Sequence, residues 1–163
     1  MENTTIYQEE IQLLKQELEE EKRRPKIGIG ICCYNEDGKI LVGRRINSKI
    51  GTCQFPGGHL EYGETFEECS VRELAEETGI QTEPHQYKYI TTLNVRKPEH
   101  NFHNVGIIMS VKVDKDVEFQ NLEPHKNEGW EWMAWEDFTK RDDLFCPMYL
   151  LFEQGYTKIE QFY

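Results

Sequence analysis

Long apolar runs and positive charge are what this sequence lacks most clearly. No stretch approaches the roughly 20 apolar residues that a membrane-spanning helix needs, and the first residues, MENTTIYQEEIQ, are polar and acidic, unlike a signal peptide. The chain has 19 Lys and Arg against 30 Asp and Glu, a net charge of −11. This balance argues against non-specific binding to duplex nucleic acid or to an anionic membrane, so we expect neither as a partner.

Cysteines are also few, and they form no recognisable framework. There are five, an odd number, two of them adjacent and none in a CxxC pair: Cys32, Cys33, Cys53, Cys69 and Cys146. This pattern fits reduced thiols in a cytosolic protein better than disulfides or a zinc site. We therefore expect a cytoplasmic protein.

The residues that are present suffice for one folded domain. With 163 residues, 37% of them hydrophobic and 12% aromatic, the chain is long enough to bury a core. Residues 5–24 predict a charged helix with a narrow stripe of Ile11, Leu14 and Leu18, which Pro25 ends. We expect residues 1–25 to form a helical arm, either solvated and packed weakly on the domain or paired with a second subunit as a short coiled coil.

Residues 26–163 predict a single domain of the α/β or α+β class. Strand-like segments at 26–34 and 39–45 flank the turn signal NEDG, and further strands are expected at 87–95, 102–113 and 130–135. A helix is expected from Thr65, with Glu68 completing a capping box, to Gly79. A second helix is expected within 143–154. Mixed strand spacing with helices suggests layers, helix on sheet on helix.

The predicted helix after Gly57 and Gly58 is crowded with glutamates. On a helical wheel its apolar residues share one face, whereas Glu73, Glu76 and Glu77 converge on another strip. Like charges at this spacing repel one another. A divalent cation such as Mg²⁺ or Mn²⁺ removes that cost because it prefers carboxylate oxygens. A solvated acidic face is the alternative interpretation.

The spacing of these residues is more specific than the charge. Gly58, five residues, Glu64, seven residues, and then RELAEETGI from Arg72 to Ile80 resembles the complete signature of the Nudix hydrolases. The resemblance implies the Nudix fold, an α/β/α sandwich around a mixed sheet, and Mg²⁺ or Mn²⁺ as cofactor. It also implies roles for particular residues: metal ligation by Glu73, Glu76, Glu77 and the Gly58 carbonyl, and a catalytic supporting role for Arg72.

Segments outside the signature resemble one subgroup of the family. GTCQFPGGHLEYGETFEEC, EPHKNEGWEWMAWEDF and LFEQGY are similar to MutT-related nucleoside triphosphate diphosphatases, over roughly residues 26–163. The resemblance implies hydrolysis of a (d)NTP to (d)NMP and pyrophosphate. Alternatives are an NDP-sugar, a dinucleoside polyphosphate, a capped RNA or a prenyl diphosphate as substrate, or a catalytically silent module that binds nucleotides. The acidic surface disfavours long RNA.

Substrate-side residues follow less directly from the sequence. Arg44 and Arg45 end the second predicted strand and could meet phosphates, and Gln54 could hydrogen-bond a base edge. His59 follows Gly57 and Gly58 and could face the phosphates. The candidates for binding a small nucleotide are therefore Arg44, Arg45, Gln54, Gly57 and His59. Phe55 or Phe102 could stack on a base, and Glu128 could reach the metal from a loop.

The resemblance also implies a homodimer. The tryptophan-rich segment and the C-terminal helix, with Phe145, Met148, Leu151 and Phe152, suggest more apolar surface than one small core needs. We expect the main contact to lie in the domain, because three stripe residues of the arm would bury only a few hundred Å², roughly, against the 1,200–2,000 Å² of a stable interface.

Overall fold

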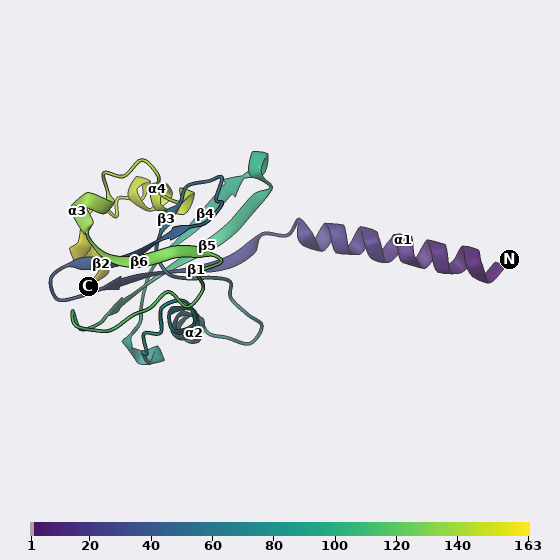
Figure 1. Ribbon diagram of the computed structural model, residues 1–163. Coiled ribbons are helices and arrows are strands. Elements are labelled where there is room, and N and C mark those ends of the chain that lie inside the picture. The colour runs from purple at the N-terminus through teal and green to yellow at the C-terminus, as the bar shows by residue number, and fades with distance from the viewer. Residues whose placement is uncertain (1) are drawn as a thin grey trace.

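The computed structural model describes residues 2–163 and shows a mixed β-sheet between two layers of helices (Figure 1). The sheet order is β3-β2-β1-β5-β4, and β6 also pairs with β2. Its strands are β1 (Lys26–Tyr34), β2 (Lys39–Arg45), β3 (Cys53–Gln54), β4 (Lys88–Lys97), β5 (Phe102–Lys112) and β6 (Asn127–Ala134). The helices are α1 (Glu2–Lys22), α2 (Phe66–Thr78), α3 (Trp135–Phe138) and α4 (Cys146–Glu153), with short 3₁₀ turns η1 (Pro84–Gln86), η2 (Pro98–His100) and η3 (Ile159–Phe162).

Two apolar clusters fill the spaces on either side of the sheet, because neighbouring strand residues point to opposite faces. On β1, Ile31 and Cys33 pack in the cluster that contains Leu74 of α2. Cys32 and Tyr34 pack in the cluster that contains α3, α4 and η3. This confirms the predicted α/β/α sandwich.

Strands β1 and β2 diverge, and this split positions the functional site. Within the described chain they pair only at Tyr34 and Ile40. The whole of β1 pairs in parallel with β5 on one edge, and its first half contacts residues 56–60 on the other edge. There the Ile29 N–H donates to the Gly58 carbonyl at 2.7 Å, and the Ile31 N–H donates to the Pro56 carbonyl at 2.8 Å. The loop before α2 is thereby fixed to the sheet like an extra strand.

Helix α2 has the boundaries that the sequence predicts. Thr65 and Glu68 form the expected reciprocal capping box, with hydrogen bonds of 3.1 and 2.8 Å. At the other end Gly79 takes a left-handed conformation, φ 79°, and its N–H donates to the Ala75 carbonyl. Leu74 and Thr78 are buried, which confirms the predicted core face.

Helix α1 extends away from the sheet (Figure 1). Ile11, Leu14 and Leu18 are each about half exposed, at 45%, 57% and 53%. One of the two interpretations expected the stripe to pack weakly on the domain. The structure shows that it does not. No helix within residues 2–163 is long and apolar enough to cross a membrane.

The C-terminal part differs in detail from the sequence prediction. The helix expected within 143–154 begins only at Cys146, because Leu144 forms a parallel bridge with Cys53 and the Phe145 N–H donates to the Cys53 carbonyl. Pro147 then lies in the first helical turn, where its missing N–H costs nothing. Strand β6 begins at Asn127, earlier than the expected 130, and Trp135 belongs to α3.

The apolar residues invoked for a domain interface are largely internal. Met148 is 3% exposed and Leu151 is 0% exposed, and both belong to the core cluster beneath α4. Trp135 is also buried, and its indole N–H donates to the Thr157 carbonyl at 2.8 Å. The sequence argument for surplus apolar surface is therefore wrong for Met148, Leu151 and Trp135, whereas Phe145 and Phe152 are partly exposed.

Asp143 joins three segments just before α4. Its carboxylate accepts a bidentate pair from Arg141 at 2.7 and 2.8 Å and a further bond from Arg44 on β2 at 2.6 Å. Its carbonyl accepts the N–H groups of Thr52 and Cys53. The hydrogen bonds from Arg141, followed by those from Arg44 and Thr52, hold the pKa of Asp143 well below its usual range.

Asp143→Asn should therefore destabilise the protein by about 1 kcal/mol at neutral pH, since the pairs are partly exposed. A carboxyl whose pKa is lowered on folding contributes stability above its unfolded pKa, about 3.9, and loses it as the pH falls further. The difference in free energy of unfolding from wild type, measured with urea, should shrink below about pH 4. Asp142→Asn, at an exposed neighbour, is the control. Equal effects of both changes, or a difference that does not vary with pH, would contradict this account.

Candidate active site

A tight glycine turn brings the loop after β3 against β1. Gly57 has φ 146°, and a Cβ there would lie 2.0 Å from the Ile29 carbonyl oxygen. A Cβ on Gly58 would lie 2.3 Å from the Glu73 carboxylate. Only glycines allow the loop, β1 and α2 to approach so closely.

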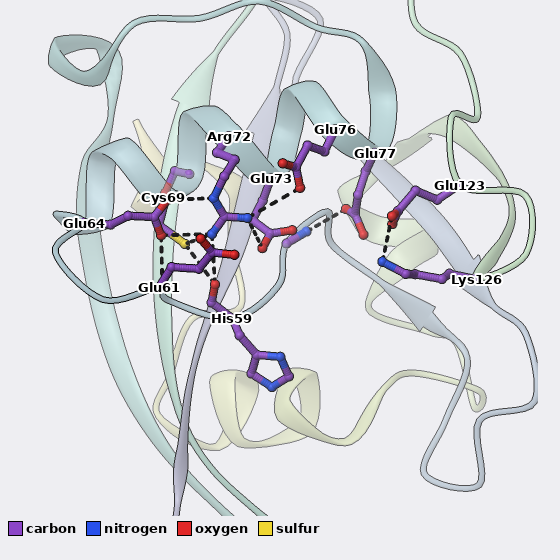
Figure 2. A network of polar contacts seen from close by, with 12 residues as sticks. His59, Glu61, Glu64, Cys69, Arg72, Glu73, Glu76, Glu77, Glu123 and Lys126 are labelled. Atoms are coloured by element: carbon purple, nitrogen blue, oxygen red, sulfur yellow. Dashed lines mark hydrogen bonds and ion pairs between the residues drawn. The ribbon is translucent and has the colours of Figure 1, made fainter.

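Arg72 holds the glutamates in position (Figure 2). Its guanidinium makes a bidentate pair with Glu64, at 2.6 and 2.9 Å, and donates to Glu73 at 2.7 Å. It also donates to the His59 carbonyl at 3.0 Å and lies 3.5 Å from Glu76. The hydrogen bonds from Arg72 lower the pKa of Glu64 to about 2, so Glu64 is a permanent anchor for Arg72.

Glu77 lies deeper than its neighbours. Its residue is 8% exposed, and one carboxylate oxygen accepts the Gly57 N–H at 2.8 Å. Burial raises the pKa of Glu77 to about 8, against the effect of that N–H, and the charges of Glu73 and Glu123 raise it further. Burial also raises the pKa of Glu73, although its bond to Arg72 acts in the opposite direction.

These residues suit a hard divalent cation. Two partly buried carboxylates with raised pKa values, and a third beside them, gain from added positive charge. Within the described residues, no three or more acidic, His or Cys side chains gather closely enough to hold a metal ion by themselves, so the expected convergence of Glu73, Glu76 and Glu77 on one point is not found. Mg²⁺ commonly binds through one or two carboxylates together with water and substrate phosphates, so an open set of ligands fits it. The Gly58 carbonyl accepts the Ile29 N–H and keeps a second lone pair.

A pocket of about 130 Å³ opens on the α4 side of the sheet, next to the glycine turn. Gly28 and Gly30 of β1 and Gly106 of β5 line its floor, and their lack of side chains leaves the space open. Phe102 and Phe145 stand on its wall, with ring centroids 6.0 Å apart in an edge-to-face arrangement. An apolar pocket with an aromatic wall suits a flat ring.

Most predicted substrate residues gather at this pocket. Arg45, Gln54, Gly57 and His59 line it, together with the predicted ligand Gly58. Arg45 donates to the Gln54 side-chain oxygen at 2.8 Å, and its guanidinium lies 4.7 Å from the centroid of the Phe145 ring. Burial lowers the pKa of Arg45. The one predicted residue that is not among those lining the pocket is Arg44, which binds Asp143.

Of the two predicted stacking residues, Phe102 lines the pocket and is partly exposed. Phe55 also lines it but is 3% exposed and stacks on Phe138, with centroids 5.3 Å apart, so it belongs mainly to the core.

The acid beside Glu77 from outside the signature is Glu123, a residue that the sequence analysis missed. Glu123 pairs with Lys126 at 2.6 Å, and both lie beside Glu77 (Figure 2). The charge of Glu123 acts on both Glu73 and Glu77. Glu128, the expected candidate, is exposed on β6. The available signal was an acid in the connection before β6, but sequence alone does not show which acid of that connection turns inward.

The fold and this arrangement of glutamates agree with the comparison with known families. The NUDIX domain model matches residues 24–149, so the chain belongs to the Nudix family.

Individual relatives match over parts of the chain. It is 41% identical over 51 residues to an RNA pyrophosphohydrolase of Sphingopyxis alaskensis, covering 31% of this chain and 32% of that protein. It is 29% identical over 117 residues to Nudix hydrolase 2 of Arabidopsis thaliana, covering 69% of this chain and 40% of that protein. The chain thus spans about a third of the length of the first of these relatives and under half of the second.

Solved structures match over most of the chain. The MutT NUDIX hydrolase from Burkholderia pseudomallei aligns with a TM-score of 0.69 and 25% identity, covering 81% of this chain and 98% of that one. An Ap4A hydrolase from C. elegans aligns with a TM-score of 0.61 and 19% identity, covering 84% of this chain and 94% of that one. At that identity the second likeness shows the fold alone.

The close contact between Gly58 and Glu73 gives a direct test of the site. Gly58→Ala should leave the fold intact, because the added methyl meets the end of a flexible side chain, but it should displace the Glu73 carboxylate. A displacement of about 1 Å can cost about 10²-fold in rate, so kcat/KM should fall by that order while the melting temperature changes little. Unchanged kinetics would show that the position of Glu73 does not matter to activity.

Proposed function

We propose that the protein is a metal-dependent hydrolase of nucleoside diphosphate-linked substrates, and that its preferred reaction converts a (d)NTP to (d)NMP and pyrophosphate. The observation that carries the proposal is the strip of Glu73, Glu76 and buried Glu77 beside the Gly57–Gly58 turn, held by Arg72. An apolar pocket of suitable shape for a base opens next to the same turn. One nucleotide can therefore present its ring to the pocket and its phosphates to the glutamates.

Glu73, Glu76, Glu77 and the Gly58 carbonyl would hold Mg²⁺ or Mn²⁺. The bound cation would offset the charge of the diphosphate and make a neighbouring water more acidic. Arg72 fixes the orientation of Glu73 through a charge-assisted hydrogen bond, and Glu64 in turn fixes Arg72. Arg72 is thus a positioning residue, since its contacts are with the glutamates and the loop.

The reaction itself is hydrolysis of a phosphoanhydride. A water oxygen forms a bond to one of the two phosphorus atoms on either side of the α–β bridge, the bridging P–O bond breaks, and the leaving group, pyrophosphate or NMP, takes the electron pair. The proton of the attacking water passes to a carboxylate of the strip. Arg45 and Gln54, joined at 2.8 Å at the pocket wall, are placed to contact the nucleotide on its base side.

Removal of pyrophosphate from the 5′ end of an RNA is a second candidate, favoured by the names of several relatives. It uses the same glutamates and the same bond cleavage. NDP-sugars, dinucleoside polyphosphates and prenyl diphosphates are further substrates to compare. A catalytically silent binding module is the alternative of another class, and the complete set of signature glutamates disfavours it.

A substrate panel tests the proposal. The purified protein is incubated with (d)NTPs, a 5′-triphosphorylated oligonucleotide, an NDP-sugar, a dinucleoside polyphosphate and a prenyl diphosphate, and the products are identified. We expect pyrophosphate and NMP from a (d)NTP, loss of activity with a chelator and recovery with added Mg²⁺. Full activity in chelator would contradict the metal assignment, and no turnover of any substrate would favour the silent module.

We further propose a homodimer whose main contact lies in residues 26–163. The three stripe residues of α1 still offer too little apolar area for a stable dimer interface by themselves. The domain exposes other apolar side chains, including Tyr62, Phe66 and Tyr149. Light scattering of the full chain and of a chain lacking residues 1–24 measures the mass. We expect dimers of both. A truncated monomer would place the contact in α1, and a full-length monomer would contradict the dimer.

A further inference from the structure

A second hollow, which we call the basic groove, adjoins the apolar pocket and has a different character. It has a volume of about 440 Å³, and the groove and the pocket share His59, Phe102 and Asn104. Four permanently charged cations line it: Arg23, Arg24, Lys26 and Arg96. Among the described residues, no Asp or Glu lines it.

The backbone brings these cations together from distant parts of the sequence. Arg23 and Arg24 occupy the turn after α1, where their N–H groups donate to the carbonyls of Glu20 and Glu21. Lys26 begins β1 and pairs with Asn104 of β5. Arg96 comes from the end of β4, where it pairs with His103. Because three separate elements contribute, the charge is concentrated by the fold and not by a basic run in the sequence.

The four cations also lack neutralising partners. None of them forms an ion pair with a described carboxylate, although the chain carries 30 acidic residues against 19 basic ones. Gathered, unpaired cations next to a ligand pocket are the arrangement that recognises an anion.

We propose that the basic groove binds a phosphate group of the substrate other than the two phosphates joined by the bond that is cleaved. The inference rests on the proposed function in one respect, that a nucleotide occupies the apolar pocket. Continuity through His59, Phe102 and Asn104 lets one molecule occupy both hollows. The extra phosphate is either the terminal phosphate of a 5′-triphosphate or a phosphate on the 3′ side of the nucleoside.

Steady-state kinetics with three substrates of the same base test the proposal. They are the nucleoside 5′-diphosphate, the 5′-triphosphate and the 5′-diphosphate that also carries a 3′-phosphate. We expect kcat/KM to be about tenfold higher for one of the two substrates with an extra phosphate, as one charged hydrogen bond supplies. A preference for the triphosphate identifies the terminal phosphate, and a preference for the 3′-phosphate identifies the other source.

Arg24→Gln and Arg96→Gln should each bring this ratio close to one. The matched control is Lys112→Gln, which removes the same charge from the other end of β5, where Lys112 pairs with Tyr34. The control should keep the wild-type ratio, and melting temperatures check that all variants fold. Equal kcat/KM for the three substrates in the wild type, or a ratio unchanged in both arginine variants, would overturn the proposal.

Binding separates failure of this inference from failure of the proposed function. Calorimetry compares a nucleoside 5′-monophosphate with the 3′,5′-bisphosphate and with inorganic pyrophosphate, using wild type and Arg96→Gln. Suppose that none of the substrates is hydrolysed. The groove assignment is still supported if the wild type binds the bisphosphate or pyrophosphate and Arg96→Gln binds it about tenfold more weakly. If hydrolysis occurs but neither kinetics nor binding depends on Arg24 or Arg96, the groove assignment is wrong and the proposed function stands.

Discussion

The charge on one face of α2 is the constraint on which the rest of the structure depends. Glu64, Glu73 and Glu76 share a single cation, Arg72, which also bonds the His59 carbonyl of the loop. Glu77 does not contact Arg72, and its carboxylate accepts a hydrogen bond from the Gly57 N–H instead. Burial raises the pKa of Glu77 to about 8, although the Gly57 N–H and the charge of Lys126 act in the opposite direction. The fold therefore accepts local electrostatic repulsion that a bound cation can relieve.

The sheet explains why the glutamates of α2 lie next to the apolar pocket. β1 separates from β2 after a single paired position, and the glycine turn fills the gap. The same turn contacts α2 on one side and opens on the pocket on the other. Glycines on β1 and β5 make the pocket hollow. The proposed sites of bond cleavage and base binding thus lie on opposite sides of one short loop, with the basic groove at its edge.

The sequence predicted what local patterns determine. The capping box at Thr65 and the end of α2 at Gly79 follow from spacing along one helix, and the structure agrees. The roles of the glutamates stay a prediction. The sequence did not predict features that depend on distant segments. The bridge between Leu144 and Cys53 shortens α4, the pairing with Asp143 places Arg44 outside the pocket, and Glu123 turns toward Glu77 where Glu128 was expected. The basic groove arises from three elements and has no sequence signature.

The central claim is that the acidic strip of α2 is a catalytic site and not a solvated face. The most direct measurement compares kcat of Glu77→Gln with that of Glu67→Gln, an isosteric change on the same helix about 80° away around the axis. Glu77→Gln should lower kcat by roughly 10³-fold or more with a native circular dichroism spectrum, because it removes a charged ligand of the proposed cation that stabilises the transition state. Glu67→Gln should leave kcat within about twofold, as expected of a surface substitution. Equal losses in the two variants, or full activity in Glu77→Gln, would contradict the account.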